Sequence, residues 1–299
     1  MQPIEPNTPP NSPVWRVIHH PMMLLLLSVP MVFGCAAVSS GIGRALKASH
    51  ADGGGVVTAI AGVAIFFGAY WAFVRFVERR PVAEFAFRRA PVELAIGIAG
   101  GVVILAAIVG LMAALGSYRV VGYNGPQILA VPMAIAIFPG FSEEIALRGI
   151  FFRLIERWLG SWVALALSAS LFGFGHIFNP GATWVAAIGI AFEAGIMLAA
   201  LYMITRRLWM AIGLHAAWNF AEGGIFGTPV SGLQVAGLLR PWIGGPDLVT
   251  GGSFGPEASL PAMGIATAVG IILLYVAWRR GRFVAPSWVR RRQGAGVQE

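Results

Sequence analysis

Phe138-Pro-Gly-Phe-Ser-Glu143-Glu144-Ile-Ala-Leu-Arg148 is a stretch in which three charged side chains interrupt an otherwise apolar segment. A charged side chain at the centre of a membrane costs roughly 2.5–3.5 kcal/mol on insertion scales, so charges at that depth usually serve a function. The stretch therefore predicts a membrane helix that carries functional groups.

Gly97 and Gly101 form a second informative pattern, because two small residues four positions apart allow helices to approach closely.

The composition excludes an ordinary soluble domain. Of the 299 residues, 57% are hydrophobic and 11% are charged, and the mean hydropathy is +0.75. Soluble domains have about 25% charged residues. We expect an all-α, polytopic integral membrane protein. The net charge of +8 does not indicate nucleic-acid binding, because the basic residues flank apolar segments where they set topology beside lipid headgroups.

Apolar runs of about 20 residues, the length that crosses a bilayer, predict about eight transmembrane helices. The seventh run is the least certain, because it contains His215, Asn219 and Glu222. The predicted spans are 21–43, 54–77, 92–115, 126–147, 160–179, 182–204, 208–226 and 259–278.

The distribution of basic residues predicts the orientation. With eight spans, fifteen arginines fall in loops on one side, and four basic residues fall on the other. By the positive-inside rule, both termini lie in the cytoplasm. The first set is Arg16, Arg79, Arg80, Arg88, Arg89, Arg153, Arg157, Arg206, Arg207, Arg279, Arg280, Arg282, Arg290, Arg291 and Arg292, and the second is Arg44, Lys47, Arg119 and Arg240.

The chain divides into a disordered N-terminal tail (1–14), one transmembrane helical domain (15–285) and a basic C-terminal tail (286–299). Residues 78–89 mix arginines with two phenylalanines and are expected to lie among lipid headgroups. Residues 227–258 form a long loop rich in glycine and proline, and so long a loop in a compact protein suggests a functional role such as a lid.

The first polar motif separates two carboxylates. Glu144 and Arg148 are four residues apart, so they can form an ion pair on one helix face. Glu143 lies about 100° around the helix and is left uncompensated, as a general base requires. We expect Pro139-Gly140 to break or kink the helix just before the pair, with Ser142 as an N-cap.

Two further motifs follow in later spans. Phe172 and His176 share one helix face, and so do His215 and Asn219. The last pair can donate hydrogen bonds to an oxyanion, or His215 can join Glu143 and His176 as ligands of a divalent metal ion such as zinc. Both readings stay open. Of the other acids within the predicted spans, Glu193 is interpreted as structural, and the role of Glu222 is undecided.

Taken together, the three motifs resemble those of the CPBP family of CAAX-type intramembrane proteases, in a form like bacterial members. Glu143, Glu144 and Arg148 match the first family motif, Phe172 and His176 the second, and His215 and Asn219 the third. The resemblance extends over about residues 80–280. It implies an intramembrane endopeptidase, which for a bacterial member sits in the inner membrane, and leaves open whether the substrate is prenylated.

In this reading Glu143 and His176 activate a water molecule, His215 and Asn219 stabilise the oxyanion, and Glu144, Arg148 and Phe172 support them. The reaction proceeds without metal or with one divalent ion, and the expected partners are membrane lipids and a peptide or protein substrate. Two alternatives remain: a non-catalytic partner such as a bacteriocin-immunity or scaffold protein, and a proton-coupled transporter. Both histidines and Glu143 together disfavour the first. The polar residues cluster between 143 and 222 rather than in two repeated halves, which disfavours the second.

Overall fold

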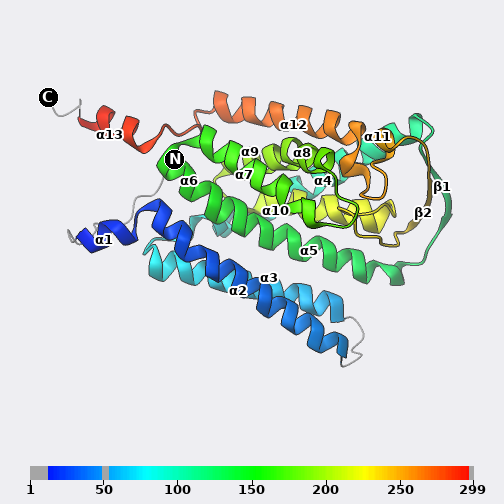
Figure 1. The fold of residues 1–299 in the computed structure, drawn as a ribbon, viewed down its shortest axis with the longest axis horizontal. Coiled ribbons are helices and arrows are strands. Elements are labelled where there is room, and N and C mark those ends of the chain that lie inside the picture. The colour runs from blue at the N-terminus through cyan, green and yellow to red at the C-terminus, as the bar shows by residue number, and fades with distance from the viewer. Residues whose placement is uncertain (1–12, 49–53, 296–299) are drawn as a thin grey trace.

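The computed structural model describes residues 13–48 and 54–295, which form a bundle of long helices with one small sheet at an end (Figure 1). The predicted N-terminal tail lies outside the described residues except for Pro13 and Val14, which begin the first helix. The main helices are α1 (Pro13–Ile18), α2 (Pro21–Ala48), α3 (Gly54–Ala72), α4 (Ala90–Ala114), α5 (Ala130–Glu144), α6 (Arg153–Leu159), α7 (Ser161–Gly175), α8 (Trp184–Ile190), α9 (Ile196–Thr205), α10 (Trp209–Asn219), α11 (Asp247–Thr250), α12 (Leu260–Arg279) and α13 (Ser287–Ala295).

Among the described residues, 7 helices are long and apolar enough to cross a membrane by themselves. They correspond to seven of the predicted spans, so the chain is a polytopic helical membrane protein. The remaining prediction, 208–226, forms α10 and continues into a π-helical turn, η8 (Phe220–Ile225). This helix is too short to meet the same length criterion, and most of its residues are buried by neighbouring helices.

Close approaches at glycine place α10 in the middle of the bundle. A Cβ atom on Gly97 would lie 2.3 Å from the Met210 carbonyl oxygen, and one on Gly101 would lie 2.5 Å from that of Leu214. The small-residue pair of α4 therefore contacts the α10 backbone, as its spacing predicts. On the other side, a Cβ on Gly140 of α5 would lie 2.8 Å from that of Ala216.

The expected break at Pro139-Gly140 is wrong. Helix α5 runs through Pro139, and the chain then continues without a loop through a long π-helical segment, η5 (Ile145–Phe152), into α6. Ser142 is not an N-cap, because its hydroxyl donates to the Phe138 carbonyl one turn earlier. Gly140 allows α5 to pack closely on Ala216. The helix changes from α-helical to π-helical winding after Glu144 rather than before it.

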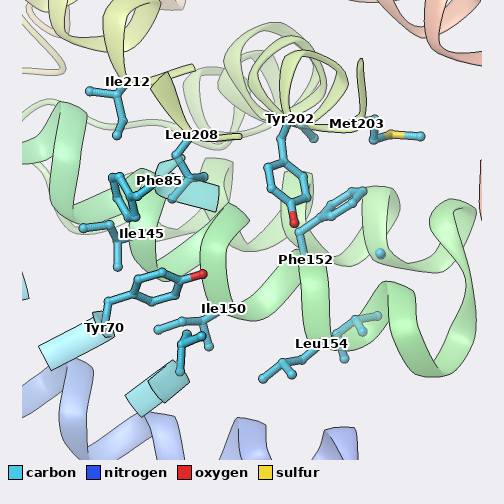
Figure 2. Packing of buried hydrophobic residues seen from close by; sticks show 14 of the residues in the cluster. Tyr70, Phe85, Ile145, Ile150, Phe152, Leu154, Tyr202, Met203, Leu208 and Ile212 are labelled. Atoms are coloured by element: carbon cyan, nitrogen blue, oxygen red, sulfur yellow. The ribbon is translucent and has the colours of Figure 1, made fainter. Parts of the chain in front are cut away.

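Residues 78–89 are partly buried in the bundle, and their expected position among lipid headgroups stays a prediction. Glu78, Arg80 and Glu84 are buried, and Arg80 pairs with both glutamates at 3.0 and 2.9 Å. Arg153 donates to Glu78 from η5–α6, so a charge network closes this end of the bundle. Phe85 is buried beside Tyr70 in the core that Figure 2 shows, where the Tyr70 hydroxyl donates to the Gly149 carbonyl at 3.3 Å.

The two ends of the bundle differ. Helices α1 and α13 lie at one end, and the antiparallel pair β1 (Tyr118–Tyr123) and β2 (Leu239–Ile243) lies at the other (Figure 1). The predicted C-terminal tail contains α13, where Arg290 donates to the Arg157 carbonyl. The even number of predicted spans agrees with this placement of α1 and α13.

Candidate active site

A cavity of about 190 Å³ brings the three motifs together. Glu143 on α5, His176 just after α7, and His215 and Asn219 on α10 all line it. The long loop covers part of the cavity through Val230, Ser231 and Leu233. The structure therefore collects four side chains from three separate predicted spans, while a lid movement of the loop stays a prediction.

The adjacent glutamates have different surroundings. The Glu144 and Arg148 side chains are both 0% exposed, and Arg148 Nη1 donates to Glu144 Oε1 at 2.8 Å. Arg148 Nη2 also lies 3.3 and 3.2 Å from the carbonyl oxygens of Ala194 and Gly195. Glu143 lies partly exposed in the cavity wall and forms no ion pair with the described residues. The Glu144 carboxylate is thus held in an ion pair, whereas the Glu143 carboxylate is available to a ligand in the cavity.

Glu144 also holds a histidine of the third motif. Its Oε1 atom lies 3.0 Å from Nδ1 of His215, a contact that the sequence spacing did not reveal. A carboxylate only accepts hydrogen bonds, so Nδ1 of His215 carries the proton. The other ring nitrogen, Nε2, is left for the cavity. Sequence reasoning assigned Glu144 to Glu143 and Arg148 alone and therefore missed this role.

His176 is oriented in a similar way by its own helix. Its Nδ1 atom lies 2.7 Å from the Phe172 carbonyl oxygen, which can only accept, so Nδ1 is the donor. In a neutral ring the proton on Nδ1 leaves a lone pair on Nε2. His176 therefore offers the cavity a proton acceptor without any further partner.

Phe172 connects the three motifs through its ring. The Arg148 guanidinium lies over that ring, 4.6 Å from its centroid, which is a cation–π geometry. The ring centroids of His176 and His215 lie 5.0 and 5.7 Å away. Phe172 thus packs against Arg148 of the first motif and His215 of the third, in addition to His176 of its own motif.

Asn219 is 6% exposed and borders the cavity one helical turn after His215. Its amide forms no hydrogen bond with the residues that the structure describes, so its N–H groups are available to a bound substrate. The i, i+4 spacing on α10 places it on the same face as His215, as the sequence predicts.

The three candidate metal ligands share the cavity. Glu143, His176 and His215 all border it. Within residues 13–48 and 54–295, no three His, Cys, Asp or Glu side chains lie together as a group that could hold a metal ion. A divalent ion shared by these three residues therefore stays a prediction.

Three residues around the cavity went unrecognised in the motif search. Glu257 and Ser231 line it, and the Ser231 hydroxyl donates to Glu257 Oε2 at 2.5 Å. Trp218, between His215 and Asn219, also borders it. Glu257 lies near the end of the glycine- and proline-rich loop, so no helical spacing relates it to the motifs, and only the folded chain brings it to the cavity.

A comparison with protein families identifies the segment that carries these motifs. Residues 125–221 match the family model described as type II CAAX prenyl endopeptidase Rce1-like. This segment is similar to Rce1-like domains. The match includes Glu143, His176, His215 and Asn219 and ends before Glu222 and Glu257. No curated protein and no solved structure matches the chain. The family match thus agrees with the resemblance seen in the motifs.

Proposed function

We propose that the protein is an intramembrane endopeptidase that hydrolyses a peptide bond with a water molecule activated by Glu143 and His176. The observation that carries this proposal is the shared cavity of Glu143, His176, His215 and Asn219 within the segment similar to Rce1-like domains. A carboxylate without an ion pair, a histidine with a free Nε2 and an amide with free N–H groups are what peptide hydrolysis requires.

Glu143 acts as the general base in this proposal. It accepts a proton from a water molecule that His176 Nε2 orients, and the oxygen attacks the carbonyl carbon of the scissile bond. The C–N bond then breaks, and the proton held by Glu143 passes to the leaving amine. The fixed proton on Nδ1 of His176 supports this role, because it leaves Nε2 as an acceptor.

His215 and Asn219 stabilise the oxyanion that forms during attack. Since Nδ1 of His215 donates to Glu144, a second donation from Nε2 requires the imidazolium form, and the Glu144 carboxylate favours that charge. Each well-placed oxyanion donor contributes about 3–4 kcal/mol to the transition state. The His–Glu contact thereby supports the donor role of His215.

The proposed setting is the inner membrane of a bacterium, with both termini in the cytoplasm and a peptide or protein substrate reaching the cavity from the lipid or the water. The arginine bias and the common end of α1 and α13 support the orientation.

Purified protein in lipid vesicles, mixed with a library of quenched fluorescent peptides, tests the proposal. We expect wild type to cleave at least one peptide, and Glu143→Gln to lose activity by at least a hundredfold while keeping the wild-type unfolding temperature. Asp247→Asn is the matched control, because it removes an exposed carboxylate outside the cavity. Full activity of Glu143→Gln would contradict the general-base role, and a wild type inert toward the entire library would favour the scaffold or transporter alternatives.

A further inference from the structure

The cavity is lined by carboxylates and imidazoles but by no lysine or arginine among the described residues. Glu143 and Glu257 are its acidic lining residues. Glu257 is 8% exposed and forms no ion pair within the described chain; its partner is the Ser231 hydroxyl. A buried carboxylate without a cation is costly, so a partner is expected from outside the chain.

Two more carboxyl groups lie behind this wall. Glu193 and Glu222 are 1% and 0% exposed, and they lie in π-helical turns, η7 (Ala191–Gly195) and η8. Both Glu222 carboxyl oxygens and Oε1 of Glu193 lack hydrogen-bond partners among the described residues. Such turns are rare and are frequent at functional sites. Neither residue is among those that line the cavity.

The Glu222 carboxyl is directed toward the cavity wall. The Trp218 indole N–H and the Glu257 backbone N–H both contribute to its electrostatics, although neither forms a hydrogen bond of good geometry with it. Trp218 and Glu257 themselves line the cavity. Glu222 therefore lies behind the surface that a substrate would touch, whereas Glu257 lies in that surface.

The nearest buried cation cannot neutralise these acids. Arg148 is committed to Glu144 and to the carbonyl oxygens of Ala194 and Gly195, next to Glu193. The arginines at the bundle end pair elsewhere: Arg207 with Glu93, and Arg206 with Glu156. Glu257 is thus left without a lysine or arginine partner among the described residues.

We propose that Glu257, held by Ser231, binds a lysine or arginine side chain of the peptide substrate close to the bond that is cleaved. This inference rests on the proposed endopeptidase function and adds the substrate class. Opposite charges across an interface contribute specificity, because a neutral or acidic side chain leaves the buried carboxylate without its partner.

Matched peptides that differ at one position test the proposal. Each quenched peptide of the library is made in three forms, which carry Lys, Gln or Glu at the same position. We expect wild type to cleave the Lys form at least tenfold faster, in kcat/KM, than the Gln form. Glu257→Gln should lose that preference, Glu257→Lys should favour the Glu form, and Asp247→Asn should behave as wild type.

A binding measurement separates this proposal from the proteolytic one. Fluorescence anisotropy of labelled Lys and Gln peptides is compared on Glu143→Gln and on Glu143→Gln/Glu257→Gln, neither of which needs to cleave. Tighter binding of the Lys peptide that depends on Glu257 supports the site even if no cleavage occurs. Equal binding and equal cleavage of Lys and Gln peptides by proteins that retain Glu257 would overturn the proposed role of Glu257. The endopeptidase function would still stand, because the protein would cleave both forms.

Discussion

Oε1 of Glu144 lies 3.0 Å from Nδ1 of His215, and this contact joins two motifs that are 71 residues apart in the chain. The same oxygen accepts a hydrogen bond from Arg148 at 2.8 Å. A single carboxylate atom therefore fixes both the tautomer of His215 and the position of a fully buried guanidinium. The paired glutamates of the first motif consequently have separate tasks, and their variants should fail in different ways.

Glu144→Gln is expected to lose stability as well as activity. Removing one side of a buried ion pair costs roughly 3–5 kcal/mol, because the remaining charge is left uncompensated. His215 also loses the carboxylate that stabilises its imidazolium form. Thermal unfolding in detergent should show a clearly lower midpoint than that of Glu143→Gln, whose carboxylate has no ion pair. Equal midpoints for the two variants would contradict this division of tasks.

Phe172→Leu should weaken the site without removing any polar group. The substitution keeps an apolar side chain of smaller size but loses the ring over which Arg148 lies, and such cation–π contacts are worth about 0.5–2 kcal/mol. We expect a lower unfolding midpoint and a several-fold lower kcat. Phe192→Leu is the control, because Phe192 is 54% exposed on the bundle surface. An effect no larger than that of the control would show that the ring is dispensable.

Gly101→Ala tests the close packing of α4 on α10. A Cβ atom there would lie 2.5 Å from the Leu214 carbonyl oxygen and 3.0 Å from the Trp218 amide nitrogen, so the helices must separate. Overpacking of this kind costs about 1–3 kcal/mol and should displace His215 and Asn219. Gly110→Ala on the same helix meets nothing within 4 Å and should fold and cleave like wild type. Two indistinguishable variants would argue against the contact.

Acid should remove the stabilisation that Glu78 provides. Burial alone would raise the pKa of Glu78, but its ion pairs with Arg153 and Arg80 prevail and lower the pKa from 4.5 to about 2. Because the folded value lies below the unfolded one, the contribution is present above pH 4.5 and is lost as the pH falls toward 2. It amounts to about 3 kcal/mol. The difference in unfolding free energy between wild type and Glu78→Gln should shrink over that window, whereas a gap independent of pH would refute the assignment.

Reporter fusions test the orientation. Fusions after Arg88 and after Arg282 should report the cytoplasm, and a fusion near Asp247 should report the other side, because the positive-inside rule assigns most arginines to the first set of loops. The same fusions are also made on Glu93→Gln as a control, because this variant removes the ion pair between Glu93 and Arg207. An outer signal from the C-terminal fusion would contradict the predicted even number of spans.

The sequence by itself determined the class of the protein and the residues that meet in the cavity. Long apolar runs must form helices in lipid, because every backbone polar group needs an internal partner there. Charges and imidazoles inside those runs are costly, so Glu143, His176 and His215 could be singled out without a structure. The Gly97 and Gly101 contact with α10 also followed from spacing, since small residues four apart allow a close approach.

Only the tertiary structure decided which polar groups pair across the bundle. The Glu144–His215 contact, the burial of Glu78 and Arg80, and the arrival of Glu257 in the cavity wall all join residues from different segments. Local spacing reports which residues share a helix face, but the rotation and depth of each helix depend on packing against all of its neighbours. For the same reason Pro139 did not break its helix: the tight contact of Gly140 with Ala216 and the π-helical winding after Glu144 outweigh the local preference of proline.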